Sequence, residues 1–494
     1  KTISGINSLG VAGCLNDVGV VQLRRREYEI ALRCFEDSIE VWRAQLEDGH
    51  EFIGETLVNM GELNSAKMDF AAAVENYVEA VDIFKEKRGA TDISVAYVYS
   101  KLGDTLVRLE EYNNAVEAYQ QCLSIRTLAL GTESLQVASV NSDLGSVYHI
   151  LGCHEQARQI LDESLRVMKD KVRVSDDKLA DTQYTLGTVL MKLKRRDEAF
   201  EHFQDALELR KKRYGDEDLL VANVLGEMGS IYDSRREYQK ALSCYNECLR
   251  VRQMHLGNVE SVGDMFLKIG NIDTSLEDNE SALENFSSAL GIYKSVLGEE
   301  SPGVAKVFNS MGTIYDEQND LHTALKYYKE AHRLRKVNFG DDSMKVAGSL
   351  DSIAGIYQKQ SLNEKALKCL KEALRIRTLK LGKAHVEVGT TLFGMGIVFS
   401  EMGDLDKAEE CYNAALRIRR KGHGESSIEV AQTLHNLGSV HAMKEDYSEA
   451  LQCWRNSLGM CREAGLADDH RMVATTLKNI EIAANYLEEQ EQHF

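Results

Sequence analysis

Small and apolar residues recur along this chain with a period of 42 residues. A glycine column is followed by an alanine after twelve residues, a large apolar or aromatic residue after sixteen, and a small residue after nineteen. Spacings of three and four place the last three columns on one stripe of a helix. Short side chains let two helix axes approach closely, so each repeat is predicted to be a pair of antiparallel helices packed where the small columns lie.

The glycine column defines eleven repeats. Its members are Gly19, Gly61, Gly103, Gly145, Gly187, Gly229, Gly270, Gly312, Gly396 and Gly438, with Ala354 in the remaining repeat. The interval is 42 residues throughout except between Gly229 and Gly270, where it is 41. We expect repeats over residues 11–469, a leading segment over residues 1–10 that continues from a longer chain, and a capping helix with a polar tail over residues 470–494.

The pattern Gly-x11-Ala-x3-aromatic-x2-small resembles the tetratricopeptide repeat, whose commonest period is 34 residues. Segments such as 289–298 and 373–382, which end in Leu-Gly, are similar to the 42-residue repeat of kinesin light chains. The resemblance implies an all-α fold, a right-handed superhelical solenoid with a concave groove that holds partner segments. A heptad coiled coil, which kinesin light chains carry ahead of their repeats, is not found in this sequence.

The first helix of each repeat carries a second stripe at positions −6, −3, +1 and +4 from the glycine column, facing away from the apolar stripe. The resemblance implies that this stripe lines the groove. We name the following members the groove stripe: Tyr97, Ser100, Asp104, Ser142, Tyr184, Thr188, Ser230, Asn309, Thr313, Asp316, Asp351, Phe393, His435 and Ser439. They are mostly short and polar, with scattered aromatic residues as candidate anchors. The alternative interpretation is a solvated face.

Charge narrows the partner class. The 494 residues hold 59 Lys+Arg and 78 Asp+Glu, a net charge of −19, which argues against nucleic acid and anionic membranes as partners. The sequence contains no run of about 18 apolar residues, so it predicts no membrane-spanning helix. The charges at the groove positions are mainly acidic, so we expect a neutral-to-basic protein or peptide segment as partner, within a multiprotein assembly. A Lys-x3-Asn carboxylate clamp is missing from these positions.

Two columns of arginine lie near the end of the second helices. One holds Arg126, Arg210, Arg252, Arg335, Arg377 and Arg419, and the other, two residues earlier, holds Arg250, Arg333, Arg375 and Arg417. They complement the negative end of the helix dipole, and we expect the loops that follow, 215–218, 298–300 and 340–342, to supply acidic partners. The alternative is an anion-binding ladder.

No motif in the sequence predicts catalysis, a cofactor or a metal. Phosphate-binding glycine loops, metalloprotease motifs and nucleophile elbows are all missing. Most of the ten cysteines fall in the repeat columns, where neighbours are a full repeat apart, so we expect core packing rather than disulfides or metal ligation. Unpaired thiols are typical of a reducing compartment, which favours an intracellular, cytoplasmic protein.

Three function classes remain open. The favoured one is a non-catalytic interaction scaffold or adaptor. The second is the sensor or regulatory repeat region of a larger nucleotide-binding switch protein or other enzyme, since relatives of these repeats occur fused to such domains. The third is a stand-alone enzyme.

The sequence contains a single proline, Pro302, in the segment that joins the seventh and eighth repeats. Other repeats place Leu135, Leu219, Met344, Val386 or Ile428 in this slot. A proline inside a helix removes a backbone hydrogen bond and clashes with the preceding turn. We therefore expect these apolar residues to extend the next helix by a turn.

Overall fold

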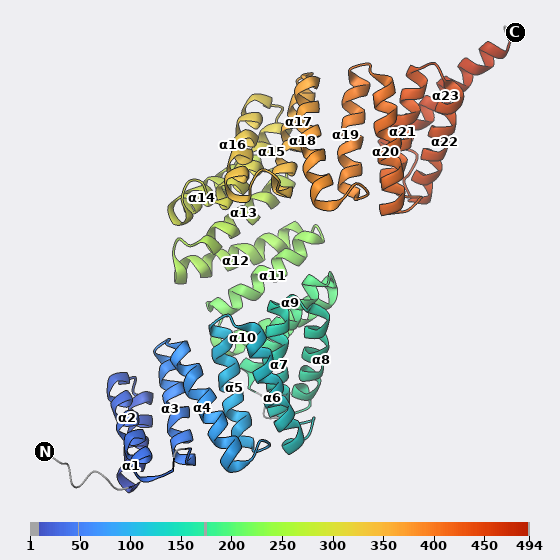
Figure 1. The fold of residues 1–494 in the computed structure, drawn as a ribbon. Helices are drawn as coiled ribbons and strands as arrows, with labels where there is room; N and C mark the ends of the chain where they lie inside the picture. The colour runs from blue at the N-terminus through green and yellow to red at the C-terminus, as the bar shows by residue number, and fades with distance from the viewer. Residues whose placement is uncertain (1–8, 48, 172–174, 493–494) are drawn as a thin grey trace. The chain divides into compact units, whose positions relative to one another are not determined.

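A computed structural model describes residues 9–47, 49–171 and 175–492 of the chain. These residues form 23 α-helices and no strand (Figure 1). The predicted all-α class is confirmed. Contacts divide the chain into two compact units, residues 1–251 and 252–494, and the boundary falls inside α12 (Tyr238–Leu256). Each unit is a solenoid of stacked helix pairs.

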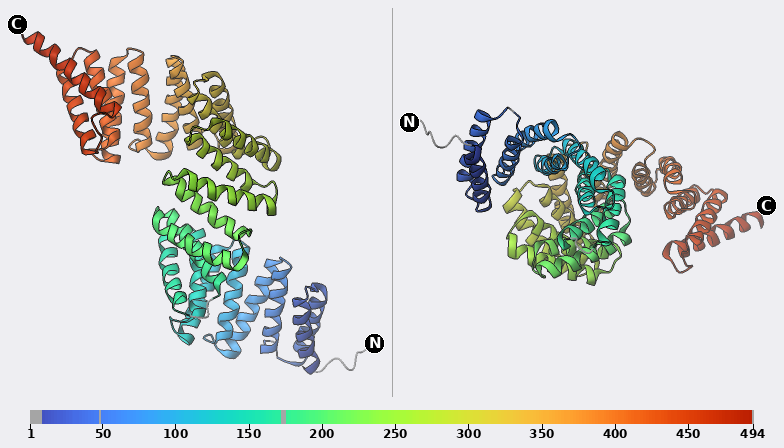
Figure 2. Two further views of the ribbon diagram at one scale, coloured as in Figure 1. Left: turned by 180° about the vertical axis from the view of Figure 1, so that it is seen from behind. Right: turned by 90° about the horizontal axis from the view of Figure 1, so that it is seen from below.

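The N-terminal unit consists of five helix pairs followed by the pair that reaches the boundary. Its helices are α1 (Leu9–Arg24), α2 (Tyr28–Gln45), α3 (Glu51–Ala66), α4 (Phe70–Arg88), α5 (Ile93–Arg108), α6 (Tyr112–Leu130), α7 (Leu135–Ile150), α8 (His154–Lys169), α9 (Asp176–Lys192), α10 (Arg196–Tyr214), α11 (Leu219–Ser234) and most of α12. Helices that follow one another in sequence pack side by side from α1 to α11, as the two views of Figure 2 show. One buried apolar cluster runs from Ala12 to Val147.

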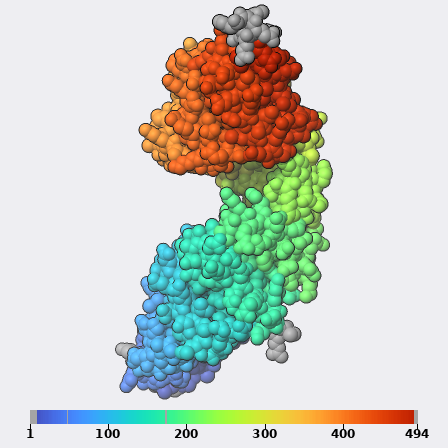
Figure 3. Space-filling model, turned by 90° about the vertical axis from the view of Figure 1, so that its right-hand side faces the viewer, coloured from blue at the N-terminus to red at the C-terminus, as the bar shows by residue number. Residues whose placement is uncertain are grey.

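The C-terminal unit repeats the same arrangement and ends in a single helix. Its helices are α13 (Glu260–Ser275), α14 (Asn279–Leu297), α15 (Pro302–Glu317), α16 (Leu321–Phe339), α17 (Met344–Lys359), α18 (Asn363–Leu381), α19 (Val386–Glu401), α20 (Leu405–His423), α21 (Ile428–Met443), α22 (Tyr447–Glu463) and α23 (Arg471–Gln492). On the face drawn in Figure 3, the orange-to-red side chains of the last helices form a continuous surface.

The glycine column makes room for the aromatic column of the same repeat. A Cβ built on Gly103 would lie 2.7 Å from a ring carbon of Tyr119, and one built on Gly61 would lie 2.5 Å from a ring carbon of Tyr77. Real Cβ contacts are not that short, and both rings are buried. Where the column holds Ala354, the sixteenth residue after it is Leu370 instead of an aromatic ring, and both belong to one buried cluster.

The small column also joins the two helices of a repeat by hydrogen bonds. Where this column holds serine, the fully buried hydroxyl donates to the carbonyl oxygen of an alanine 26 residues earlier, in the first turns of the first helix. The pairs are Ser38 with Ala12 at 2.8 Å, Ser164 with Ala138 at 2.7 Å, and Ser457 with Ala431 at 2.7 Å. A buried hydroxyl is thereby satisfied at the closest point of the helix pair.

The turn between the two helices of a repeat passes through the left-handed region. The residue seven positions after the glycine column has a positive φ, and in nine repeats it is not glycine, as in Arg26 (φ 64°) and Met68 (φ 64°). Only Gly152 and Gly403 supply a glycine there. Left-handed backbone costs about 1–2 kcal/mol for a residue with a side chain, so packing of the two helices holds this turn in place.

The predicted effect of the proline slot is wrong. Pro302 is the first residue of α15, and Leu135, Leu219, Met344, Val386 and Ile428 are the first residues of their own helices. All six helices have the same length of 16 residues. The first helical position has no intrahelical partner for its N–H, so proline fits there as well as leucine does. The replacements therefore add no turn.

Polarity and repeat register predict a leading segment over residues 1–10 and a capping helix with a polar tail over residues 470–494. Residues 1–8 of the leading segment and residues 493–494 of the polar tail lie outside the described residues. Leu9 and Gly10, which we assigned to the leading segment, are the first residues of α1. At the other end, α23 packs against α22 in a buried cluster that includes Trp454 and Ala483.

Candidate functional site

The groove stripe lies on the first helices of both units. In the N-terminal unit its residues belong to α5 (Tyr97, Ser100, Asp104), α7 (Ser142), α9 (Tyr184, Thr188) and α11 (Ser230). In the C-terminal unit they belong to α15 (Asn309, Thr313, Asp316), α17 (Asp351), α19 (Phe393) and α21 (His435, Ser439). Tyr97 and Asp104 are exposed, and most of the others are half-buried.

One member does not face solvent. Ser142 is only 4% exposed, and its hydroxyl lies 2.7 Å from the hydroxyl of Thr182 on α9. In this repeat the residue three positions before the glycine column points toward the next first helix. Ser142 is therefore removed from the set of candidate partner contacts.

The other short hydroxyl side chains mostly bond to their own helix. Each donates to a backbone carbonyl three or four residues earlier: Thr188 to Thr185, Ser230 to Gly226, Thr313 to Asn309, and Ser439 to His435. Such bonds are the usual solution for Ser and Thr inside a helix. These residues leave space above the helix, and their hydroxyls already have partners.

Two of the predicted aromatic anchors are covered by arginine. The guanidinium of Arg210 lies 4.5 Å from the ring centre of Tyr184, and that of Arg419 lies 4.1 Å from the ring centre of Phe393. Cations stacked in this way are attracted by the ring face. Tyr97 remains the aromatic residue of the stripe that is open to solvent, with 44% of its surface exposed.

The fourth predicted aromatic position, His435, is also in contact with another part of the protein. Its Nδ1 lies 2.8 Å from the hydroxyl of Thr476 on α23. Burial lowers the pKa of this imidazole below its ordinary value of 6.5. His435 therefore contributes to the contact with α23.

Most carboxylates at the groove positions are already neutralised within the protein. Asp316 pairs with Lys359 at 2.5 Å, and Asp351 bonds to the guanidinium of Arg377. In contrast, Asp104 accepts a hydrogen bond from the phenol of Tyr119 at 2.6 Å and pairs with no cation among the described residues. The negative charge that the stripe presents to a partner is therefore smaller than its number of acidic residues suggests.

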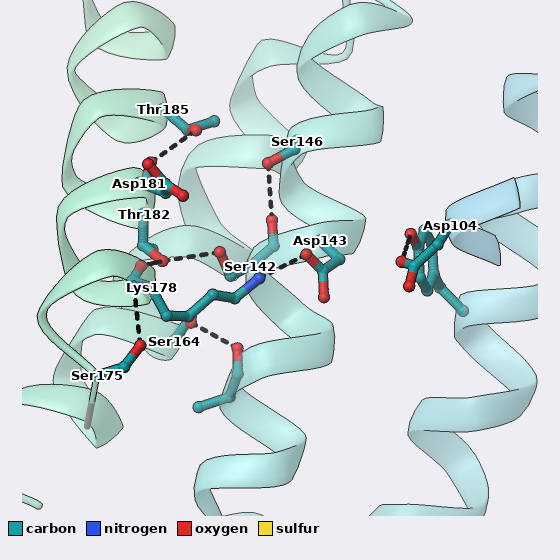
Figure 4. Close-up of polar contacts among 12 residues, drawn as sticks. Asp104, Ser142, Asp143, Ser146, Ser164, Ser175, Lys178, Asp181, Thr182 and Thr185 are labelled. Atoms are coloured by element: carbon teal, nitrogen blue, oxygen red, sulfur yellow. Dashed lines mark hydrogen bonds and ion pairs between the residues drawn. The ribbon is translucent and has the colours of Figure 1, made fainter. Parts of the chain in front are cut away.

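Sequence reasoning missed a polar cluster between α7 and α9 (Figure 4). Lys178 extends from α9 to Asp143 on α7, with 2.5 Å between Nζ and Oδ1. Burial raises the pKa of Asp143, and the opposing effect of Lys178 is smaller. Asp143 lies two residues before the glycine column, outside the stripe positions, and one other repeat, with Lys345, has a lysine at the position of Lys178, so the period did not mark either residue.

The later arginine column joins successive repeats. Arg210 and Arg419 are each 4% exposed, and their Nη1 donates to the carbonyl oxygen ten residues later, on the first turn of the next helix, at 3.0 Å in both cases. Arg210 also pairs with Asp181 at 2.9 Å. Arg210 and Arg419 thus have the structural role that we expected for the column, because their guanidiniums are buried between helices.

The earlier arginine column pairs with the acidic loops. We name as the rim ladder Arg166, Arg250, Arg333 and Arg375, each of which bonds two carboxylates. One is a glutamate three residues earlier, and the other lies 33 residues earlier, in the loop that leads into the same repeat: Glu133, Glu217, Glu300 and Asp342. We expected the loops after each arginine to supply these acids; the structure shows that the loops before them do.

A cavity of about 420 Å³ opens beside Tyr97 in the N-terminal unit. Its apolar wall is formed by Val58, Phe84, Ile93 and the Tyr97 ring, and Arg126 lies at its edge. Ile93 is 43% exposed. The cavity therefore offers an open apolar surface with a polar margin, the usual composition of a site for one side chain of a ligand.

The described residues form no disulfide and no metal-binding cluster. All ten cysteines are free thiols, and Cys122, Cys248, Cys453 and Cys461 are buried. Burial raises the pKa of Cys122 and of Cys453 to about 11. No cluster of three His, Cys, Asp or Glu side chains there could hold a metal ion. Within the same residues, no helix has both the length and the apolar content needed to cross a bilayer.

Comparisons with known proteins agree with the helix-pair geometry. Profiles described as tetratricopeptide repeat match residues 11–86, 94–170, 178–254, 261–336 and 346–421, and a second profile of that description matches residues 430–470. No curated protein matches the chain in sequence.

Solved structures resemble the chain at low sequence identity. The apo form of RapI is 15% identical, covers 75% of this chain and 99% of its own, and has a TM-score of 0.55. The apo form of the quorum sensor NprR from B. thuringiensis is 15% identical, covers 74% and 98%, and has a TM-score of 0.51. The nearly identical TPR-like repeats of a Podospora anserina kinesin light chain protein are 15% identical, cover 42% and 98%, and have a TM-score of 0.37.

Proposed function

We propose a function from the premise that this chain belongs to the tetratricopeptide repeat family. The chain acts as a non-catalytic scaffold that binds segments of partner proteins along the first helices of its repeats. One observation carries this proposal. The cavity beside Tyr97 combines an aromatic ring that is 44% exposed, an exposed Ile93 and the half-buried Arg126. Within the protein the Tyr97 hydroxyl donates to Glu62 at 2.7 Å and Lys101 Nζ lies 5.4 Å from the ring centre, and the remaining surface of Tyr97 and Ile93 is open to a partner.

The N-terminal unit is the better candidate for the main contact. Arg210 and Arg419 cover the aromatic residues on α9 and α19, whereas the equivalent Arg126 on α6 donates to the carbonyl oxygen of Gln136, at 3.3 Å. Tyr97 occupies the position that Asp181 holds opposite Arg210. An anchoring side chain of a partner buries exposed apolar surface, and the surface around Tyr97 and Ile93 is of this kind.

The charge of the partner segment is a finer proposal. Asp104 on α5 and Asp264 on α13 accept hydrogen bonds from Tyr119 and Tyr293 at 2.6 Å and pair with no cation among the described residues. These two carboxylates on first helices favour a neutral-to-basic segment. Asp316 and Asp351 are poor places to test this, because neutralising them would also break internal ion pairs.

A photo-crosslinking experiment tests the scaffold function. Benzoylphenylalanine replaces Tyr97 in the protein expressed in its native source, and crosslinked partners are identified by mass spectrometry. Partner peptides should appear at this position and disappear when Ile93→Ala shrinks the apolar wall. The matched control carries the same crosslinker at Leu128, which is 73% exposed on the second helix α6. Equal capture at both positions would contradict binding along the first helices.

The unpaired Asp104 permits a separate test of charge. Asp104→Asn keeps an oxygen that can accept the Tyr119 hydroxyl and removes one negative charge. We expect affinity for a captured basic segment to fall about threefold, and the salt dependence of binding to weaken. An unchanged salt dependence would remove the charge proposal and leave the scaffold proposal standing.

A second candidate function is a regulatory sensor region of a larger protein. The structure of NprR, described as a quorum sensor, resembles this chain in fold. Under this function, binding at the first helices would change the activity of an attached domain. Measuring that activity in the full-length protein with and without a captured partner separates the two functions, because a scaffold predicts no change in turnover. The ten free thiols also support a reducing, cytoplasmic location.

A further inference from the structure

The rim ladder follows the loops that join successive repeats, on a different surface from the groove stripe. In each of its four members, one guanidinium bonds to two carboxylates. The N–O distances are 2.6–2.9 Å, apart from the contact of Arg375 with Asp342, which is shorter. Hydrogen bonds from the arginine lower the pKa of Glu163, Glu247 and Glu372. Each triad therefore has one positive and two negative charges, a net charge of −1.

The tenth repeat has the arginine of the rim ladder without its two acidic partners. Arg417 on α20 occupies the same register as Arg375, but both acidic positions hold alanine, Ala414 three residues earlier and Ala384 in the preceding loop. Arg417 is exposed and forms no ion pair among the described residues. Loss of both carboxylates turns a site of charge −1 into a site of charge +1.

Two further substitutions add to the reversal of charge. Lys383 stands in the loop beside Ala384, where the equivalent loop positions hold Asp216, Glu299 and Asp341. Lys421 follows Arg417 by one helical turn, where the equivalent positions hold Met254, Val337 and Leu379. Both lysines are exposed and have no carboxylate partner in the described part of the chain. We name Lys383, Arg417 and Lys421 the basic rim patch.

We propose that the basic rim patch is a docking site for a short acidic segment of a partner protein. The inference goes beyond the proposed function, because the patch lies on the loop rim and not on the first helices. Carboxylates of the partner would replace the two that the tenth repeat lacks, with the guanidinium of Arg417 bonded as in the other triads. The exposed methyl group of Ala384 leaves room for them.

The surroundings favour a short protein segment over a long polyanion. One repeat away, the Arg375 triad has a net charge of −1, and the whole chain has a net charge of −19. Repeats stack about 10 Å apart, which is close to the screening length of about 8 Å at physiological salt. A nucleic acid that continued past the patch would therefore be repelled, whereas a few acidic residues would contact only the three cations.

Fluorescence anisotropy with a labelled peptide of six glutamates tests the proposal on the full chain. The decisive variant is Ala384→Asp/Ala414→Glu, which restores the two missing acids and changes none of the cations. Because four other repeats carry this triad, the variant is expected to fold, and circular dichroism checks that it does. We expect binding at low salt to the wild-type protein and a loss of affinity of at least about tenfold in the variant.

Two controls complete the experiment. Arg417→Ala/Lys421→Ala should weaken binding to the same extent, and Arg375→Ala, which removes a cation already paired with two acids, should leave it unchanged. Wild-type affinity in the Ala384→Asp/Ala414→Glu variant would overturn the proposal, as would equal or tighter binding of single-stranded DNA through the same residues. Crosslinking at Tyr97 is independent of these outcomes.

Discussion

At the scale of single residues, the repeat depends on a steric match between glycine and an aromatic ring. Ten repeats have the glycine, which faces an aromatic ring in nine of them and Leu161 in the repeat of Gly145, and Ala354 occurs with Leu370. A methyl group on any of these ten glycines would enter space occupied by the large side chain that faces it from the second helix. The identity of one residue thus sets how closely the two helices can approach.

Gly103→Ala is expected to destabilise the protein by about 2 kcal/mol, because overpacking a buried contact costs about 1–3 kcal/mol. The matched control is Gly355→Ala in α17, where an added Cβ meets nothing within 4 Å, and there alanine should stabilise by about 0.5–1 kcal/mol. Urea denaturation of both variants measures the difference. A double-mutant cycle with Tyr119→Leu should show favourable coupling; additive effects would contradict the steric explanation.

Buried histidines predict how stability depends on pH. Burial lowers the pKa of His149, His202, His332 and His435 from 6.5. The unfolded chain then binds more protons than the folded chain below about pH 6.5, so the free energy of unfolding should fall as the pH is lowered from 7 to 5. His435→Gln should make this fall smaller, and His322→Gln, with an exposed side chain, should not. Denaturation midpoints at several pH values measure both.

At the scale of elements, each first helix begins at a position set by its cap and not by the residue that follows. Asp218 is extended and its carboxylate accepts the N–H of Leu220 at 2.7 Å, so that α11 starts at Leu219. Ser301 precedes Pro302 with the same extended backbone. Extended backbone is also what a following proline requires, so the slot accepts proline or an apolar residue without a change in helix length.

Leu219→Pro is therefore expected to change the free energy of unfolding by less than about 1 kcal/mol. The control Leu225→Pro, in the buried middle of the same helix, should cost about 3 kcal/mol or more because it removes a backbone hydrogen bond and forces a kink. Thermal denaturation followed by circular dichroism distinguishes the two. Equal destabilisation by both variants would show that the first helical position is constrained by packing.

At the scale of the whole molecule, each unit is stabilised by contacts between neighbouring repeats. Buried arginines of the later column tie the end of one second helix to the start of the next first helix, and hydroxyl pairs such as Ser142 with Thr182 link successive first helices. The pair of α21 and α22 packs in the same way against α23, where the Nδ1 of His435 lies 2.8 Å from the hydroxyl of Thr476.

Ending the chain at Asp469 removes α23 and should expose Trp454, which is 4% exposed in the intact protein. We expect a red shift of tryptophan emission and a lower midpoint for unfolding of the last helix pair. A Trp42→Phe background leaves Trp454 as the single tryptophan of the chain. An unshifted spectrum in the truncated protein would mean that α23 does not cover this repeat.

The sequence by itself determined the helix-pair fold, the number of repeats and the close contact at the glycine column. A period of 42 residues repeated eleven times averages out local variation, so columns of small and aromatic residues could be identified without coordinates. It did not reveal the left-handed turns at Arg26 or Met68. Packing of the two helices imposes that backbone on ordinary residues, and no glycine marks it.

Tertiary structure decided which residues of the stripe are available to a partner. Whether Tyr184, Phe393, Ser142 or Asp351 faces solvent depends on side chains 26–40 residues away that stack on, bond to or neutralise it. Those contacts cross between helices, and a helical period describes only one helix at a time. The exposure of Tyr97, and the pairing that shows which two acids Arg417 lacks, became known only from contacts between helices.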